Sequence, residues 1–154
     1  MTLFQAGLTK TSGESIIAER KKIVDDKLCC ALSINHPLAF SEKLKLSDLY
    51  DETVMLIRHG WNRHTDAVRD ELEANHPDIK IIDVPFFNID VFNRCENGEE
   101  FLIGFQKWSN IHPLLRMVPI EWEYTTPFGI LHSDKPSPVV NEFLQAVSKL
   151  KHQN

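Results

Sequence analysis

The chain has 154 residues, of which 42% are hydrophobic and 25% charged, and its formal net charge is -5. This length suits one domain with its own core, and the composition lies far from that of disordered chains. The acidic balance argues against nucleic-acid binding by the chain itself, because phosphate contacts need clustered Lys and Arg.

The cysteines and the apolar runs exclude further classes of protein. Three cysteines, two of them adjacent at Cys29 and Cys30, form neither a disulfide framework nor a zinc-binding spacing. The sequence has no apolar run near 18 residues, and its start lacks the basic and apolar regions of a secretory signal. We therefore expect a cytoplasmic protein with no membrane partner, no bound metal and no cofactor.

The first third of the chain is dominated by extended patterns, alternating or continuously apolar. Strands are predicted over residues 2–9, 16–24, 28–34 and 53–57, and a short helical turn over residues 46–50. The apolar run 28–34 stops at Asn35-His36-Pro37. These four strands and the turn precede the first long helix.

Helices and strands alternate in the remainder. A helix is predicted over residues 65–75, ended by His76-Pro77 because a residue before proline avoids the helical region. Asn88 is expected to cap a second helix that ends near Asn97-Gly98. Strands are predicted over residues 79–84, 101–105, 120–124 and 128–132. Pro138 opens a last helix, with one apolar stripe formed by Val140, Phe143, Leu144, Val147 and Leu150. This alternation predicts an α/β fold with a partly parallel sheet.

One motif at the end of a predicted strand resembles the signature of the histidine phosphatase superfamily. Arg58-His59-Gly60 would supply an attacking imidazole beside an arginine that neutralises phosphate oxygens. The motif lies in the middle of the chain, however, and Trp61 replaces the acidic-threonine continuation. His132 lacks the glycine expected after a second catalytic histidine. A phosphotransfer enzyme is therefore a third-ranked alternative, and the expected protein is not an enzyme.

Several segments in their order resemble another family, the LysR-type transcriptional regulators. The sequence Asn35-His36-Pro37-Leu38-Ala39 follows an apolar strand, and Leu46-Ser47-Asp48-Leu49 follows shortly after. The segments "AGLTKT" (6–11), "FNIDVFNRCENGEEFLIGF" (87–105) and "PFGILHSDKPSPVVNEFLQAV" (127–147) extend the resemblance over nearly the whole chain. The resemblance is to the effector-binding domain of that family.

The resemblance implies an α/β fold similar to type II periplasmic binding proteins, with one complete lobe and one truncated lobe around a ligand cleft. Residues 37–115 would form the second lobe, and residues 1–36 and 116–154 the truncated first lobe. The family's winged helix-turn-helix has no counterpart before Thr2. DNA would therefore be contacted only through a helix-turn-helix domain absent from this chain. The chain would be an expressed fragment, the product of a disrupted gene or a natural short partner.

Candidate ligand residues follow the carboxyl ends of strands, where helix N-termini and loops present polar groups in open α/β sheets. They carry an aromatic ring, amides and guanidinium groups, which suit a small anionic effector with an apolar part. The set comprises Thr9, Lys10, Arg58, Gly60, Trp61, Asn62, Arg63, Asn88, Asp90, Phe105 and Gln106.

The leading hypothesis is a non-catalytic effector-binding region of a LysR-type regulator. A solute-binding protein of similar fold is the first alternative, which the lack of an export signal disfavours. A homodimer is expected, because an incomplete sheet exposes edges and apolar faces that another chain can cover.

Overall fold

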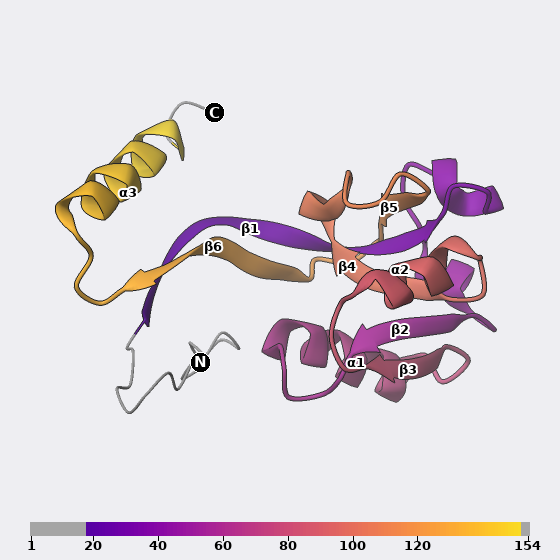
Figure 1. The fold of residues 1–154 in the computed structure, drawn as a ribbon. Helices are drawn as coiled ribbons and strands as arrows, with labels where there is room; N and C mark the ends of the chain where they lie inside the picture. Colours follow the sequence, from indigo (N-terminus) through magenta and orange to yellow (C-terminus); the bar gives the residue numbers. More distant parts are fainter. Residues whose placement is uncertain (1–17, 152–154) are drawn as a thin grey trace. The chain divides into compact units, whose positions relative to one another are not determined.

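The computed structural model describes residues 18–151, and the chain divides into two compact units. We call residues 26–126 the sheet unit, and the described residues of the other unit, 18–25 and 127–151, the terminal unit. Figure 1 shows their elements. The strand expected over residues 2–9, with candidate residues Thr9 and Lys10, lies outside the described residues.

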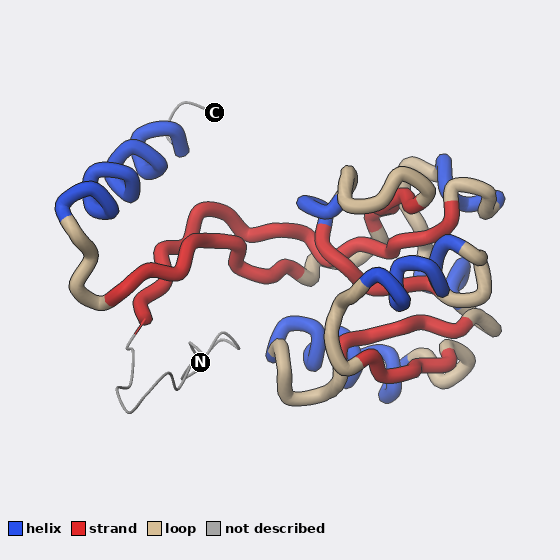
Figure 2. Tube along the Cα trace, viewed as in Figure 1, coloured by secondary structure: helices blue, strands red, loops and turns tan. Residues whose placement is uncertain are grey.

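The sheet unit is built on a mixed sheet with strand order β3-β2-β4-β1-β5. The strands are β1 (Ala18–Ser33), β2 (Thr53–Ile57), β3 (Lys80–Val84), β4 (Phe101–Phe105) and β5 (Leu115–Pro119). β2 is parallel to both β3 and β4, whereas β1 is antiparallel to β4 and β5. Figure 2 shows the adjacent strands in red. The carboxyl ends of β2, β3 and β4 consequently lie at one edge of this sheet.

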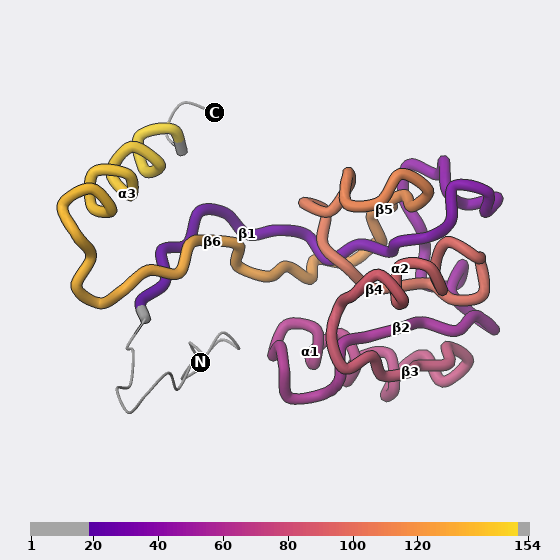
Figure 3. The backbone as a smooth tube through the Cα atoms, in the orientation of Figure 1, coloured from indigo at the N-terminus to yellow at the C-terminus, as the bar shows by residue number. Residues whose placement is uncertain are grey.

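Two helices cover opposite faces of the sheet unit. Along β2, Val54 and Leu56 belong to the apolar cluster that contains Val68 of α1 (Arg63–Asn75). Met55, between them, belongs to the cluster that contains Val91 of α2 (Ile89–Glu96). Side chains alternate between the faces of a strand, so both faces of this central strand are buried. The chain path β2-α1-β3-α2-β4 can be followed in Figure 3.

The ends of these helices follow local sequence signals. Asn62 caps α1, which begins at Arg63, two residues before the predicted start, and ends at Asn75 before His76-Pro77 as expected. Asn88 caps α2, which ends at Glu96, and Gly98 follows at φ +76°. That positive φ favours glycine, because side chains with a Cβ rarely adopt it. Both helices are confirmed.

Of the strands predicted within the described residues, one is wrong and the others are confirmed. Residues 18–33 form a single long strand, residues 46–49 form a short 3-10 helix, and a second such turn covers Pro37–Phe40. The strand expected over residues 120–124 is wrong: the strand pairing with β1 is Leu115–Pro119. Proline cannot donate a ladder hydrogen bond, and Pro119 ends this edge strand. The segment after it is held instead by a lone bridge from Ile120 to Leu44 and by the Trp122 indole N–H, which donates to the Leu28 carbonyl at 2.8 Å.

The terminal unit contains the first part of β1, most of β6 (Thr125–Ser133) and α3 (Pro138–Lys151). β6 pairs with β1, and the two backbones approach closely at Gly129. A Cβ at Gly129 would lie 2.2 Å from the Lys21 carbonyl oxygen, so only glycine fits. On α3, Leu144 is buried whereas Phe143 and Leu150 are exposed, so only part of the apolar stripe expected for this helix is buried.

None of the helices in residues 18–151 is long and apolar enough to span a bilayer.

Candidate functional site

The loop between β2 and α1 contains four of the candidate residues, Arg63 follows as the first residue of α1, and the loop is fastened at its start. The Arg58 N–H donates to the Val84 carbonyl at 2.9 Å, which ties the loop to the end of β3. Gly60 has φ +89°, and its N–H donates to both carboxylate oxygens of Asp66 at 3.2 and 3.1 Å. The turn therefore needs glycine at this position, and Asp66 of the following helix fills the acceptor position that the Gly60 N–H points at.

The end of the loop is fastened by the first turn of α1. The Asn62 side-chain oxygen accepts from the His64 N–H at 2.9 Å, as an N-cap does. The Asn62 carbonyl accepts from the Thr65 hydroxyl at 2.9 Å and from the Asp66 N–H at 2.8 Å. Asn62 thus uses its oxygens for the helix, and its side-chain amino group is the part left for a ligand.

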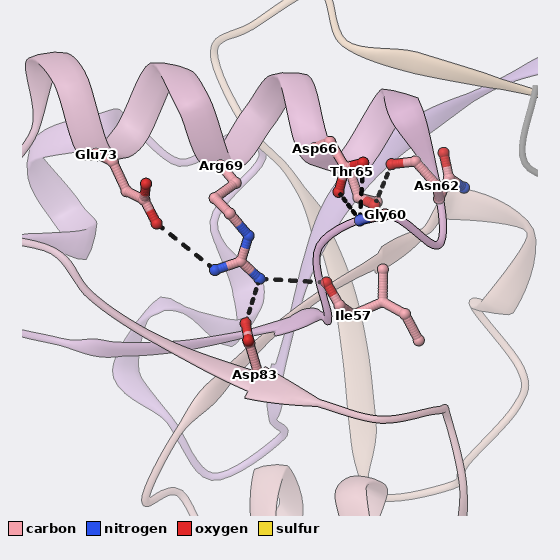
Figure 4. A network of polar contacts seen from close by, with 8 residues as sticks. All are labelled: Ile57, Gly60, Asn62, Thr65, Asp66, Arg69, Glu73 and Asp83. Atoms are coloured by element: carbon pink, nitrogen blue, oxygen red, sulfur yellow. Dashed lines mark hydrogen bonds and ion pairs between the residues drawn. The ribbon is translucent and has the colours of Figure 1, made fainter.

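A buried arginine holds the junction of β2 and the loop (Figure 4). Arg69 of α1 is only 7% exposed, and its Nη2 donates to the Ile57 carbonyl at 3.2 Å and to Asp83 of β3. Its Nη1 lies 3.7 Å from Glu73. The guanidinium therefore joins helix, central strand and edge strand just below the candidate loop. Sequence reasoning missed Arg69, because its partners lie on other elements, and it did not foresee the bond between Asp66 and the Gly60 N–H.

Above this scaffold the loop exposes cationic and aromatic groups. The Arg58 guanidinium carbon lies 4.7 Å from the centre of the Trp61 ring, a cation–π arrangement. Trp61 is 46% exposed, and His59 and Arg63 are also exposed. No carboxylate pairs with Arg58 or Arg63 in the part of the chain that the structure describes. Asp66, the acidic residue nearest to this loop in the sequence, bonds to Gly60 instead.

The next loop on the same edge leads into α2. The Asn88 side-chain oxygen accepts from the Val91 N–H at 2.9 Å, so this candidate also caps a helix. Asp90 is exposed in the first turn of α2. Two apolar side chains near Asp90 in the sequence, Phe86 and Ile89, are 53% and 59% exposed. The loop therefore combines a free carboxylate with an apolar surface.

At the end of β4 an aromatic cluster takes the place of a free polar group. Phe105 meets Trp108 edge to face, with ring centres 4.6 Å apart, and Phe87 meets Trp108 at the same distance. The buried Asp26 carboxylate accepts from the Lys107 N–H at 3.1 Å and fixes the turn that begins at Gln106. Phe105 consequently serves packing, while the exposed Gln106 remains available to a ligand.

The structure thus puts nine of the eleven candidates on three loops at one edge of the sheet. In residues 18–151 it forms no cluster of three or more histidine, cysteine or acidic side chains able to hold a metal ion. A depression of about 340 Å³ lies elsewhere, at the carboxyl end of β1 and the amino end of β5. It contains none of the candidates and is lined by Ile34, Ser109, Asn110, His112, Pro113, Leu115 and Arg116.

The three cysteines contribute no reactive thiol. All are fully buried, and the Cys95 Sγ lies 3.0 Å from the Ala31 carbonyl oxygen. Burial raises the pKa of the Cys29 thiol to about 11 and that of Cys95 to about 12. Both thiols are therefore protonated at neutral pH, and catalysis or metal binding through them is disfavoured.

Comparisons with known proteins identify the fold. No protein-family model and no curated protein sequence matches the chain. The CcmR regulatory domain of Synechocystis PCC6803, solved in complex with 2-PG, matches with a TM-score of 0.64 and 16% identity, over 93% of this chain and 71% of that one. The effector-binding domain of QuiR, solved with shikimate, matches with a TM-score of 0.65 and 14% identity, over 94% and 69%.

CbnR, a LysR family transcriptional regulator, matches with a TM-score of 0.66 and 18% identity, over 86% of this chain. The match covers 47% of CbnR, so the chain spans about half the length of that regulator. At these identities the likeness concerns the fold. It confirms the resemblance expected from the sequence: the chain has the type II periplasmic-binding-protein-like fold of the LysR-type effector-binding domains.

Proposed function

We propose that this chain is the effector-binding region of a LysR-type transcriptional regulator and that its effector is a small organic anion. The observation that carries the proposal is the loop from Arg58 to Arg63. Its backbone is fixed at both ends, and it exposes two guanidinium groups around an indole ring at the carboxyl edge of the sheet. Ligands of open α/β sheets bind at this edge.

The chemistry of the loop favours an anion with an apolar part. A guanidinium group forms paired, charge-assisted hydrogen bonds with a carboxylate or a phosphate. The Trp61 ring offers a flat apolar surface, and the exposed Phe86 and Ile89 add to the apolar character of this edge. The neighbouring proteins support this class of ligand, since CcmR was solved with 2-PG and QuiR with shikimate.

The bond between Asp66 and the Gly60 N–H limits which groups of the loop can bind an anion. It already accepts from the Gly60 N–H, so an anion would be held by side chains of Arg58 and Arg63 rather than by that backbone amide. The side-chain amino groups of Asn62 and Asn88 and the amide of Gln106 would complete the polar contacts. Thr9 and Lys10 stay predicted ligand residues outside the described part of the chain.

A binding titration tests the proposal. Isothermal titration of the chain with benzoate, shikimate and phosphoglycolate should show saturable binding for at least one anion, and benzyl alcohol, which carries no charge, should bind more weakly. Arg58→Gln should weaken that binding on the order of tenfold, as expected for loss of one charge-assisted contact. Lys80→Gln removes an equal charge from the amino end of β3 and should leave binding unchanged. Equal losses for both variants, or no binding of any anion, would contradict the proposal.

The remaining expectations belong to the same proposal. A whole regulator would bind DNA through a helix-turn-helix domain, would act in the cytoplasm and would be a homodimer. The assignment of residues 37–115 to a second lobe and of residues 1–36 and 116–154 to a truncated first lobe also stays a prediction. So does the absence of catalysis: among the residues that the structure describes, no hydrogen bond or ion pair orients His59. Hydrolysis of p-nitrophenyl phosphate that is lost in His59→Ala would overturn it.

A further inference from the structure

The depression at the start of β5 lies at the edge of the sheet opposite to the candidate loops. β1 is antiparallel to β4 and β5, so the carboxyl end of β1 and the amino end of β5 lie away from the carboxyl ends of β2, β3 and β4. Its volume of about 340 Å³ is at the lower end of the range for small-molecule sites. All of its lining residues belong to the sheet unit. A small ligand would therefore fit there without a contribution from the terminal unit.

The loop of residues 109–114 forms one wall of this depression, and its backbone is held in place. The Ile34 N–H donates to the Leu114 carbonyl at 3.0 Å, which ties the loop to the end of β1. The Ile111 N–H donates to the Trp108 carbonyl at 2.8 Å, which closes the turn at the start of the loop. The wall is therefore preorganised, and a ligand would lose little affinity in ordering it.

His112 supports the same wall with both of its ring nitrogens. Its Nδ1 accepts from the Leu114 N–H at 3.2 Å, so the hydrogen of the neutral ring is on Nε2. Nε2 lies 3.6 Å from a carboxylate oxygen of Glu96, the last residue of α2. The His112 side chain is 12% exposed, and Glu96 does not line the depression. His112 therefore shapes the wall, and other side chains would make the contacts with a ligand.

Three lining side chains have polar groups that remain available. Among the residues that the structure describes, none forms a hydrogen bond with the side chain of Ser109, Asn110 or Arg116, and no carboxylate pairs with Arg116. The Arg116 guanidinium carbon lies 5.0 Å from the centre of the Phe40 ring, a cation–π arrangement that supports the group. Arg116 thus gives the lining one positive charge whose N–H donors have no acceptor in this part of the chain.

We propose that the depression binds a small organic monoanion, namely a carboxylate with a hydroxyl group and a short apolar part. A guanidinium group pairs with a carboxylate through two parallel hydrogen bonds. One guanidinium balances one negative charge, so a phosphate monoester with two charges is disfavoured. The Ser109 hydroxyl and the Asn110 amide suit the hydroxyl of the ligand. Apolar contact would come from Ile34, Pro113 and Leu115. This proposal does not rest on the effector site, which lies at the other edge of the sheet.

Amide chemical shifts of the full chain test the site residue by residue, with 3-hydroxybutyrate as the probe. The signals of Ile34, Asn110 and Arg116 should shift saturably, with a dissociation constant on the order of 1 mM, because the contacts are few. The amides of residues 58–62 report the effector loop separately. No saturable shift at Ile34, Asn110 and Arg116 would overturn the proposal.

Two related compounds test which parts of the ligand are recognised. The methyl ester of 3-hydroxybutyrate carries no charge and should bind at least tenfold more weakly at these amides, because the guanidinium loses its partner. Butyrate lacks the hydroxyl and should bind several-fold more weakly, because Ser109 and Asn110 are left without a polar contact. Equal binding of the acid and its ester would overturn the proposal.

Substitutions in the lining complete the test. Arg116→Gln should weaken binding of 3-hydroxybutyrate at least tenfold, and Arg116→Lys several-fold, because an ammonium keeps the charge but loses the paired hydrogen bonds. Asn110→Ala, outside the strands, should weaken it several-fold and is a second variant that leaves β5 intact. Lys80→Gln removes an equal charge from β3, at the other end of the strand order, and should leave binding unchanged. Equal effects of Arg116→Gln and Lys80→Gln, or binding insensitive to both Arg116→Gln and Asn110→Ala, would overturn the proposal.

Discussion

Replacing Arg69 by Met removes the guanidinium that joins α1 to the two strands below the candidate loop. The Arg69 side chain is 9% exposed, and its bond to the Ile57 carbonyl lies in the interior. A hydrogen bond from a charged donor contributes about 1.5 to 3 kcal/mol, and its loss leaves that carbonyl without this donor. The pair with Asp83 adds less than about 1 kcal/mol, because the Asp83 side chain is 58% exposed and screened by solvent.

The expected loss of unfolding free energy is therefore about 2 to 3 kcal/mol for Arg69→Met. Asp83→Asn should cost less than about 1 kcal/mol, and Glu73→Gln, which loses a 3.7 Å contact with a 58% exposed carboxylate, should be nearly neutral. The methionine chain is apolar and of similar length, so a change of packing contributes little. This ranking of the three losses of unfolding free energy is expected if the main contribution of Arg69 is its buried hydrogen bond to the Ile57 carbonyl.

Urea unfolding followed by tryptophan fluorescence measures these differences. The three tryptophans of the chain, Trp61, Trp108 and Trp122, all lie in the sheet unit, so the signal reports that unit alone. A chain of two units need not unfold in one step, and a unit-specific probe avoids this difficulty. If Asp83→Asn cost as much as Arg69→Met, the stability would come from the ion pair and the reasoning about the carbonyl would be refuted.

Three further predictions concern glycine, the terminal unit and the thiols. Gly60→Ala should lower the unfolding free energy by about 1 kcal/mol in the same assay. The loss comes from the positive φ alone, because a Cβ at this position meets no atom within 4 Å, and a much larger loss would contradict this. Gly129→Ala should speed amide hydrogen exchange in residues 19–24 and 128–132, since its Cβ would collide with the Lys21 carbonyl, and should leave exchange in the β2 amides unchanged. Iodoacetamide at pH 8 should label no cysteine of the folded chain and all three in urea, because burial raises the pKa of Cys29 to about 11 and of Cys95 to about 12. As pH rises above 9.0, the ordinary value, unfolded thiols lose protons that folded thiols keep, so stability should fall and not rise.

Local signals explain what the sequence predicts correctly. Asn88, the apolar residues Val91, Phe92 and Cys95, and Gly98 define α2 within eleven residues, and the structure places the cap and the end of the helix where this pattern predicts. At α1 two capping residues compete. The sequence pattern predicts that α1 starts at Thr65, but Asn62 is the cap. The Thr65 hydroxyl donates a hydrogen bond to the Asn62 carbonyl. A boundary error of this kind is expected when neighbouring residues share a propensity.

Features that depend on distant partners could not be predicted. The strand at residues 115–119 is short and ends in proline, and only its pairing with β1 shows it to be a strand. The same holds for the candidate site. Its place after β2 follows from the rule for parallel strands, whereas the bond from Arg69 to Ile57 spans twelve residues and depends on the packing of α1 on the sheet.

The long strand β1 makes the chain unusually sensitive to changes of length at one place. In its second half Leu28, Cys30 and Leu32 face one apolar cluster, and Ala31 faces the other. A single inserted or deleted residue there would exchange the two sets, so side chains that now pack in one cluster would point into the other. From Glu19 to Asp25 the same strand contributes only partly or fully exposed residues, and an identical change there would shift no side chain of these two clusters. Natural variants of this chain should therefore keep the length of residues 28–32 unchanged.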